Sequence, residues 1–173
     1  KNLNLNHDNI LKLASTKWNF LKFEPGLVGG HCLPVDPYYF SYICKKKKFN
    51  TRIALAGRYI NDQMAYFVRD IIKLKLKKLK LSKKSKILLC GLSYKKNVAD
   101  LRNSLAYKIF KMMKNKYVNG YDPLIDKITA KKNGLITNKE KLKKFDFYVI
   151  LTEHDVIKKI LSKINSNKII LPL

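Results

Sequence analysis

The sequence has few cysteines and no long uninterrupted run of apolar residues. Its three cysteines, Cys32, Cys44 and Cys90, are odd in number, far apart and outside any C-x-x-C pair. This spacing argues against a disulfide scaffold and is typical of a reducing compartment, so we expect a cytoplasmic protein. The histidines and cysteines lack metal-ligand spacing, so no metal site is expected. The apolar runs are too short to span a bilayer, and the first residues lack the apolar centre of a signal peptide, so no membrane partner is expected.

Acidic residues and arginine are both scarce. The chain has 12 acidic against 37 basic residues, a formal net charge of +25, and only four of the basic residues are arginine. Clustered lysine would indicate nucleic acid or an anionic membrane surface, whereas lysine spread along the chain indicates the amino-acid bias of AT-rich coding sequence. Lysine is spread over the whole chain, and arginine, which base and phosphate recognition favours, is rare. The sequence therefore favours the compositional explanation and no nucleic-acid partner, while an anionic ligand such as a nucleotide remains compatible.

The first half of the chain is predicted to be helical. A helix in residues 1–20, with Asp8 as its candidate cap, leads into a loop beneath which Trp18 and Phe20 are expected to pack. A second helix is predicted to begin after Pro37, because tyrosine and isoleucine recur there at helical spacing.

A single long helix is predicted from Thr51 to about Leu81. This stretch contains no proline, and its apolar residues recur at threes and fours. Such a helix is too long for one small core, so it is expected to bridge two domains or to form the surface of a homodimer. The Asn61–Asp62 pair within it is expected on an exposed face.

The second half of the chain alternates strands and helices, which predicts parallel βαβ units. The fold class is therefore α/β: a helical central domain over residues 1–82 with a long connecting helix, followed by a Rossmann-like parallel-sheet domain over 83–173. The predicted elements are strands at 86–92, 117–121, 147–152 and 168–171, a helix capped by Asn103 or Ser104, a short helical region after Pro123, and a helix at 153–162.

The segment after the first strand has only one glycine, Gly91, and so lacks the G-x-G-x-x-G turn that places a pyrophosphate on a helix N-terminus. The sequence therefore argues against a dinucleotide bound to this sheet in that mode. Lys95 and Arg102 follow the strand and are placed to reach into a cleft at the carboxyl edge of the sheet. The alternative for both is ordinary surface charge.

The stretch 26–39 has the most unusual composition. It holds three glycines, two prolines, a thiol, an imidazole and a carboxylate, a mixture that suits neither a helix nor a strand interior. The glycines allow close backbone approach and free N–H groups. Cys32 precedes Asp36 by four residues, which indicates a reactive sulfur with an acid/base neighbour. The alternative is a tight loop that holds a buried, inert cysteine.

Several segments together resemble the UDP-glucose/GDP-mannose dehydrogenase family. The run F-E-P-G-L-V-G-G-H-C-L-P-V-D-P-Y-Y resembles its catalytic-cysteine motif, in the branch that acts on UDP-N-acetylhexosamines. A further run, A-G-R-Y-I-N-D-Q-M, is similar to the start of its long connecting helix, and G-L-S-Y-K-K-N-V-A-D-L-R-N-S to the opening of its C-terminal domain. Y-D-P and T-E-H-D match later landmarks, the second of which usually reads T-E-W-D. The order and spacing agree over nearly the whole chain.

The resemblance implies an oxidoreductase that converts the C6 alcohol of a UDP-sugar into a carboxylate with two NAD⁺. In that chemistry Cys32 traps the aldehyde as a thiohemiacetal, whose oxidation gives a thioester, and Asp36 acts in proton transfer. Tyr94 and Lys95 match positions that contact the nucleotide-sugar, and Arg102 matches one that reaches NAD across the cleft. His31 belongs to the motif without an assigned catalytic role. The loop that lies along the substrate is matched by Phe23, Glu24, Pro25, Gly26 and Gly29.

The departures from the family pattern concern both ends of the chain. The N-terminal NAD-binding domain and the upstream lysine and asparagine that bind substrate are absent, and so is a later "DGR"-like segment. The chain is therefore expected to be a fragment, the central and truncated UDP-binding domains of a dehydrogenase, inactive alone because NAD is mostly bound elsewhere. The alternatives are a non-catalytic remnant that binds nucleotide-sugar or dimerises, and specificity for UDP-glucose. No motif identifies which hexosamine epimer is oxidised.

Overall fold

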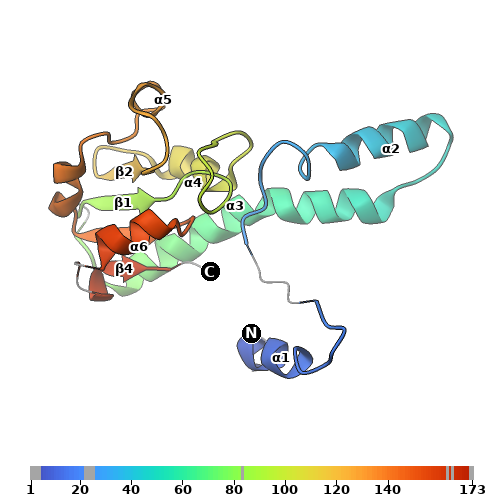
Figure 1. The fold of residues 1–173 in the computed structure, drawn as a ribbon, viewed down its shortest axis with the longest axis horizontal. Helices are drawn as coiled ribbons and strands as arrows, with labels where there is room; N and C mark the ends of the chain where they lie inside the picture. The colour runs from blue at the N-terminus through green and yellow to red at the C-terminus, as the bar shows by residue number, and fades with distance from the viewer. Residues whose placement is uncertain (1–4, 22–25, 83, 163, 165, 172–173) are drawn as a thin grey trace.

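The computed structural model describes residues 5–21, 26–82, 84–162, 164 and 166–171. Figure 1 shows a parallel sheet with its covering helices at one end and a pair of helices, α2 and α3, that extends away from it. The helix α3 runs through both parts, beneath the sheet at one end and beside α2 at the other. The predicted mixed α/β class is confirmed.

The N-terminal helix is shorter than predicted. Helix α1 spans His7–Ala14, and its cap is Asn6, whose side chain accepts a hydrogen bond from the N–H of Asn9 at 3.0 Å. Asp8 lies in the first turn instead, where a carboxylate suits the positive end of the helix dipole. Trp18 is 92% exposed, so the prediction that it packs beneath the glycine-rich loop is wrong, whereas Phe20 is half-buried.

Helices α2 and α3 form an antiparallel pair. Helix α2 spans Asp36–Lys46 and has proline in its first turn, where the missing N–H costs no helical hydrogen bond. Helix α3 spans Arg52–Lys78, so its 27 residues extend about 40 Å. Only its second half buries apolar side chains in the main core, and these are Ala65, Val68 and Ile72. The predicted single long helix is confirmed.

The four strands form one parallel sheet in the order β2-β1-β3-β4. All predicted strands occur, each shorter than the sequence pattern indicated. The strands are β1 (Ile87–Cys90), β2 (Val118–Tyr121), β3 (Phe147–Ile150) and β4 (Ile169–Ile170). The connecting helices are α4 (Leu105–Met113), α5 (Lys127–Lys132), η1 (Lys139–Lys144), α6 (Asp155–Leu161) and η2 (Ser166–Lys168).

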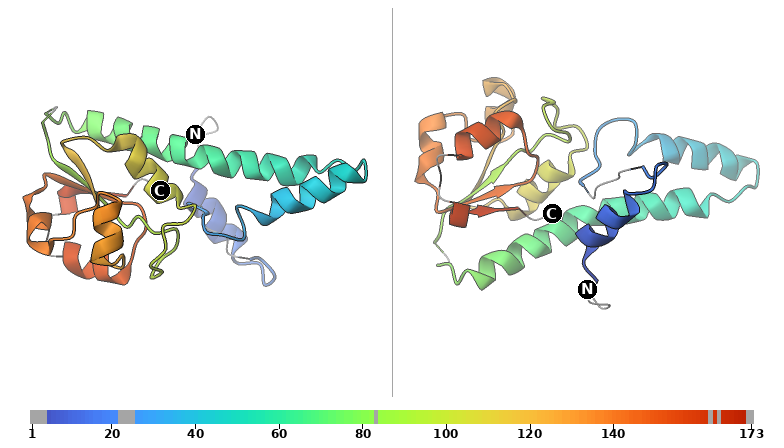
Figure 2. Two further views of the ribbon diagram at one scale, coloured as in Figure 1. Left: turned by 90° about the horizontal axis from the view of Figure 1, so that it is seen from above. Right: turned by 60° about the horizontal axis from the view of Figure 1, so that its bottom comes forward.

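Two apolar cores lie on the two faces of the sheet. One joins α3 and α4 to the sheet and includes Ile109 and Phe110, both fully buried. The other joins α6 and the η1 segment to the opposite face and includes Tyr148 and Ile157. The two views of Figure 2 show α3 and α4 on one side and α6 on the other. The carboxyl ends of the strands, where the loops after β1 and β3 meet, face the pair formed by α2 and α3.

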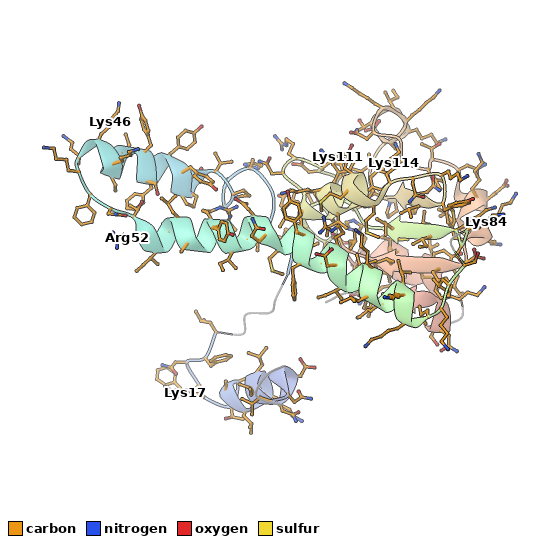
Figure 3. The ribbon with its side chains drawn as sticks, turned by 180° about the vertical axis from the view of Figure 1, so that it is seen from behind. Lys17, Lys46, Arg52, Lys84, Lys111 and Lys114 are labelled. Atoms are coloured by element: carbon orange, nitrogen blue, oxygen red, sulfur yellow. The ribbon has the colours of Figure 1, made fainter. Side chains whose placement is uncertain are left out.

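The basic side chains labelled in Figure 3 do not gather in one patch. Lys17, Lys46 and Lys84 lie far apart in Figure 3, on α1's following turn, the end of α2 and the segment before β1. Several lysines lie over aromatic rings, among them Lys46 over Tyr42. Within the described residues, no helix is both long enough and apolar enough to cross a membrane.

Candidate functional site

Cys32 and Asp36 lie in one turn at the start of α2. The N–H groups of Val35 and Asp36 donate to the carbonyl oxygen of Cys32 at 2.8 and 2.9 Å, which closes that turn. Both side chains are exposed. The four-residue spacing therefore places a thiol and a carboxylate at the same solvent-facing helix end.

His31 contacts the thiol directly. Its Nδ1 atom lies 3.0 Å from Cys32 Sγ, within hydrogen-bond distance for sulfur. An imidazole nitrogen at this distance is placed to accept the proton of the thiol when the sulfur acts as a nucleophile. No catalytic role is predicted for this histidine from the sequence, because adjacency in sequence does not determine whether two neighbouring side chains turn toward each other.

The glycines before Cys32 pack on the loop that follows β1. Gly30 has φ +98°, and a Cβ atom there would lie 2.9 Å from the ring of Tyr94. A Cβ atom on Gly29 would lie 2.7 Å from the carbonyl oxygen of Asn103. The side chain of Asn103 in turn donates to the carbonyl oxygen of Gly30 at 3.0 Å. The glycines therefore allow the cysteine loop to pack against Tyr94, although α2 and α3 separate these two segments in the sequence.

The long helix holds the same loop from the other side. Asn61 donates to the carbonyl oxygen of Val28 at 3.0 Å, and Arg58, only 7% exposed, donates to Asp62 at 2.8 Å. Asp62 also accepts from the hydroxyl of Tyr38 at 3.0 Å. The expected exposed face for Asn61 and Asp62 is therefore wrong, because both are half-buried and bonded. Beside them lies a cavity of about 650 Å³, walled by the cysteine loop, α3 and α4.

Lys95 and Arg102 both lie on the surface near the carboxyl edge of the sheet. Lys95 is exposed. Arg102, with its side chain 70% exposed, pairs with Asp100 through Nη2 at 2.7 Å and Nε at 3.0 Å. This guanidinium lowers the pKa of the Asp100 carboxyl below its usual value. Arg102 and Asp100 border a cavity of about 370 Å³, whereas Lys95 does not line it.

A buried polar cluster lies at the carboxyl ends of β1 and β2. One carboxylate oxygen of Asp122 accepts from the N–H groups of Leu92 and Ser93 at 2.7 and 2.8 Å, and from the Ser93 hydroxyl at 2.7 Å. The same oxygen lies 3.2 Å from Nε2 of His154, which is fully buried. Burial alone would raise the pKa of Asp122, but hydrogen bonds from His154, Ser93 and the backbone outweigh it and lower the pKa to about 2.

This cluster bears on the binding of a dinucleotide. In a dinucleotide fold, N–H groups beyond the first strand face the pyrophosphate. Here the N–H groups of Leu92 and Ser93 donate to Asp122 instead. The described residues therefore do not fit a pyrophosphate of NAD at this edge, in agreement with the single glycine of the segment.

Two other sets of predicted residues complete the description. Phe23, Glu24 and Pro25 lie outside the described residues, while Gly26 is exposed in the loop that leads to Gly29. Cys44 is half-buried, and Cys90 is buried in β1, where burial raises the pKa of its thiol. In the part of the chain that the structure describes, no cluster of three or more histidine, cysteine or acidic residues could hold a metal ion.

Comparisons with family profiles and with known proteins all indicate the same family. The sequence profile of the UDP-glucose/GDP-mannose dehydrogenase family, central domain, matches residues 1–63, and that of its UDP binding domain matches 88–172. The chain is 43% identical over 119 residues to a UDP-N-acetyl-D-glucosamine 6-dehydrogenase of Pseudomonas aeruginosa, covering 67% of this chain and 28% of the relative. It is 40% identical over 160 residues to Protein CapL of Staphylococcus aureus, covering 88% and 37%.

A solved structure agrees with these relatives. The UDP-D-ManNAc dehydrogenase of Pyrococcus horikoshii matches with a TM-score of 0.74 at 27% identity, covering 97% of this chain and 39% of that chain. The chain thus spans less than half the length of each relative. The two matched profiles together account for most of its residues, and the chain belongs to the UDP-glucose/GDP-mannose dehydrogenase family.

Proposed function

We propose that the intact protein containing this chain oxidises the C6 alcohol of a UDP-N-acetylhexosamine to the carboxylate. The chain would supply the nucleophile and the loop that contacts the nucleotide-sugar. The observation that carries this proposal is the packing of Gly29 and Gly30 on Tyr94 and Asn103, which brings the exposed thiol of Cys32 beside the loop of Tyr94 and Lys95. The names of the relatives support the substrate class.

The chemistry assigned to the chain begins at Cys32. Its thiolate adds to the carbonyl carbon of the substrate aldehyde, so a C–S bond forms and the carbonyl oxygen takes up a proton. After the second oxidation the carbon is a thioester, and water cleaves the C–S bond to give the carboxylate and return the thiol. His31, at 3.0 Å from the sulfur, accepts the thiol proton, and Asp36 at the same helix end takes part in proton transfer to water.

NAD⁺ supplies the oxidising power by accepting hydride. Because the described residues do not fit its pyrophosphate, we assign its main site to a domain outside this chain, with Arg102 as the contact that this chain contributes. We also propose a division into a central domain, 1–82, and a UDP-binding domain, 83–173, which the two matched family profiles support. We further propose a cytoplasmic homodimer that associates through α3, because the cysteines are free and α3 exposes large apolar side chains.

The activity is tested on the protein expressed from the complete coding sequence. With UDP-N-acetylglucosamine and NAD⁺, Cys32→Ala is expected to abolish NADH formation, whereas Cys44→Ala, in the helix α2 that follows the cysteine loop, is the matched control and keeps it. Retained turnover in Cys32→Ala removes this residue from the mechanism. UDP-glucose, assayed in parallel, is expected to be the poorer substrate.

The alternative is a binding or dimerising remnant without redox chemistry. Calorimetry of the 173-residue chain with UDP-N-acetylglucosamine, together with the turnover assay of the complete protein, distinguishes the dehydrogenase from the remnant. Binding by the chain together with turnover by the complete protein supports the dehydrogenase. Binding without turnover in either form supports the remnant.

A further inference from the structure

The loop that carries Tyr94 and Lys95 is fixed at both of its ends. At its start, Asp122 holds the N–H groups of Leu92 and Ser93, as described above. At its end, the N–H of Asn97 donates to Nδ1 of His154 at 2.8 Å. The residues between these anchors are therefore held by two contacts that converge on the Asp122–His154 pair.

His154 makes two different hydrogen bonds with its two ring nitrogens. Nδ1 accepts from Asn97, so Nε2 carries the proton and donates to Asp122 at 3.2 Å. Asp122 is ionised, because its pKa is about 2. The ring is fully buried, and these two contacts use the single donor and the single acceptor of a neutral imidazole.

Asn97 needs this support because of its backbone. It has φ +58°, the left-handed region that is costly for residues other than glycine and tolerated by asparagine. Its side chain also pairs with Asp155, donating to the carboxylate at 2.6 Å and accepting from the backbone N–H at 3.1 Å. Lys96 forms an ion pair with the same carboxylate at 2.7 Å. The end of the loop is therefore bound to the start of α6, and Lys95 immediately precedes Lys96 in the sequence.

We propose that His154 is a positioning residue for the nucleotide-sugar: through Nδ1 it fixes Asn97, and thereby the backbone that aims Lys95 and Tyr94 at the diphosphate. This inference rests on the proposed function. The Nε2 contact with Asp122 stabilises the fold, whereas the Nδ1 contact sets the affinity for the ligand.

Two substitutions separate the two nitrogens. In His154→Asn, the amide stands where Nδ1 stood and its oxygen can accept from Asn97, but it does not reach Asp122. In His154→Gln, the amide stands where Nε2 stood and can donate to Asp122, but Asn97 loses its acceptor. Both variants remove ring atoms from the same buried site, so each is expected to lower the unfolding temperature by a similar amount.

The readout is the dissociation constant of UDP, titrated by calorimetry into the 173-residue chain and its two variants. His154→Gln is expected to weaken binding about tenfold, the effect of one lost hydrogen bond, and His154→Asn by less than about threefold. Equal losses in the two variants, or losses that follow the unfolding temperatures, overturn the positioning role.

A second measurement does not require UDP or a variant that folds. Amide hydrogen exchange of the unaltered chain is expected to show the N–H of Asn97 strongly protected and that of Lys95 fast. Equal exchange at the two amides overturns the inference whatever the function of the chain. A protected Asn97 amide in a chain that binds no UDP contradicts the proposed function instead and leaves the His154 contact in place.

Discussion

At the scale of single residues, Cys32 and Cys90 lie in opposite environments. Cys32 is exposed beside His31, whereas Cys90 is buried and its thiol pKa is raised by burial and by the charge of Asp122. Because the thiolate is the reactive form, iodoacetamide is expected to label Cys32 of the folded chain first and Cys90 only on unfolding. His31→Leu should slow the labelling of Cys32 several-fold without affecting Cys44. Peptide mass mapping over time measures all three, and rapid labelling of Cys90 before unfolding contradicts the assignment.

Asp122 makes stability depend on pH. Its pKa falls from 3.8 to about 2 on folding, so its contribution to stability is full above 3.8 and is lost as the pH falls through 2. That shift corresponds to about 2 kcal/mol of unfolding free energy. Thermal unfolding followed between pH 6 and about pH 2 should therefore show a steep acid loss, and Asp122→Asn should be less stable at neutral pH and flatter in acid. If Asp122→Asn loses stability in acid as steeply as the unaltered chain, other carboxylates cause that loss of stability.

The residues to which we assign chemistry are easier to propose from the sequence than those that hold their loops in place. Cys32 and Asp36 are recognisable because a thiol, a carboxylate and several glycines within one loop have few structural uses. His154 and Asn103 carry no such signal, because their value comes from partners far along the chain, Asn97 and Gly30. Only the folded backbone defines those distances.

At the scale of elements, two glycines give a matched pair of substitutions. Gly30→Ala places a side chain at φ +98° and against Tyr94, so we expect a loss of about 1 to 2 kcal/mol and weaker UDP binding. Gly57 lies in α3 with open space around it, so Gly57→Ala should stabilise by up to about 1 kcal/mol and leave UDP binding unchanged. Chemical denaturation measures the stability of both variants, and calorimetry measures their UDP binding. If Gly30→Ala changes neither, the packing of the cysteine loop on Tyr94 contributes to neither.

The order of helices and strands follows from the sequence, but several of their ends do not. The apolar run predicts that β1 continues to Leu92, yet it ends at Cys90 because Asp122 takes the N–H groups of Leu92 and Ser93. Asn6, two residues earlier, replaces the predicted cap Asp8, since either side chain is suitable as a helix cap. Periodicity thus determines the type of an element, and tertiary hydrogen bonds determine its ends.

At the scale of the whole molecule, the long helix α3 has an exposed apolar stripe with a regular spacing. Ile53, Ile60, Phe67 and Leu74 of α3 recur every seven residues and are 91%, 63%, 57% and 60% exposed. A heptad spacing keeps these side chains on one slowly drifting face of the helix, the pattern by which two helices pack along their length. The helical periodicity of this stretch is evident in the sequence, but which of its apolar residues the sheet domain leaves uncovered is a property of the fold.

This stripe predicts that the chain self-associates. Sedimentation equilibrium should show a concentration-dependent dimer, because single exposed apolar residues are common on monomers whereas an aligned row of four marks an interface. Ile60→Lys places a charge in the middle of the row and is expected to weaken dimerisation at least about tenfold, as burial of an unpaired charge opposes association. Ile128→Lys is the matched control, because Ile128 on α5 is 84% exposed and lies outside the stripe. A chain that stays monomeric at all concentrations, or two variants that weaken association equally, would show that α3 is not the dimer surface.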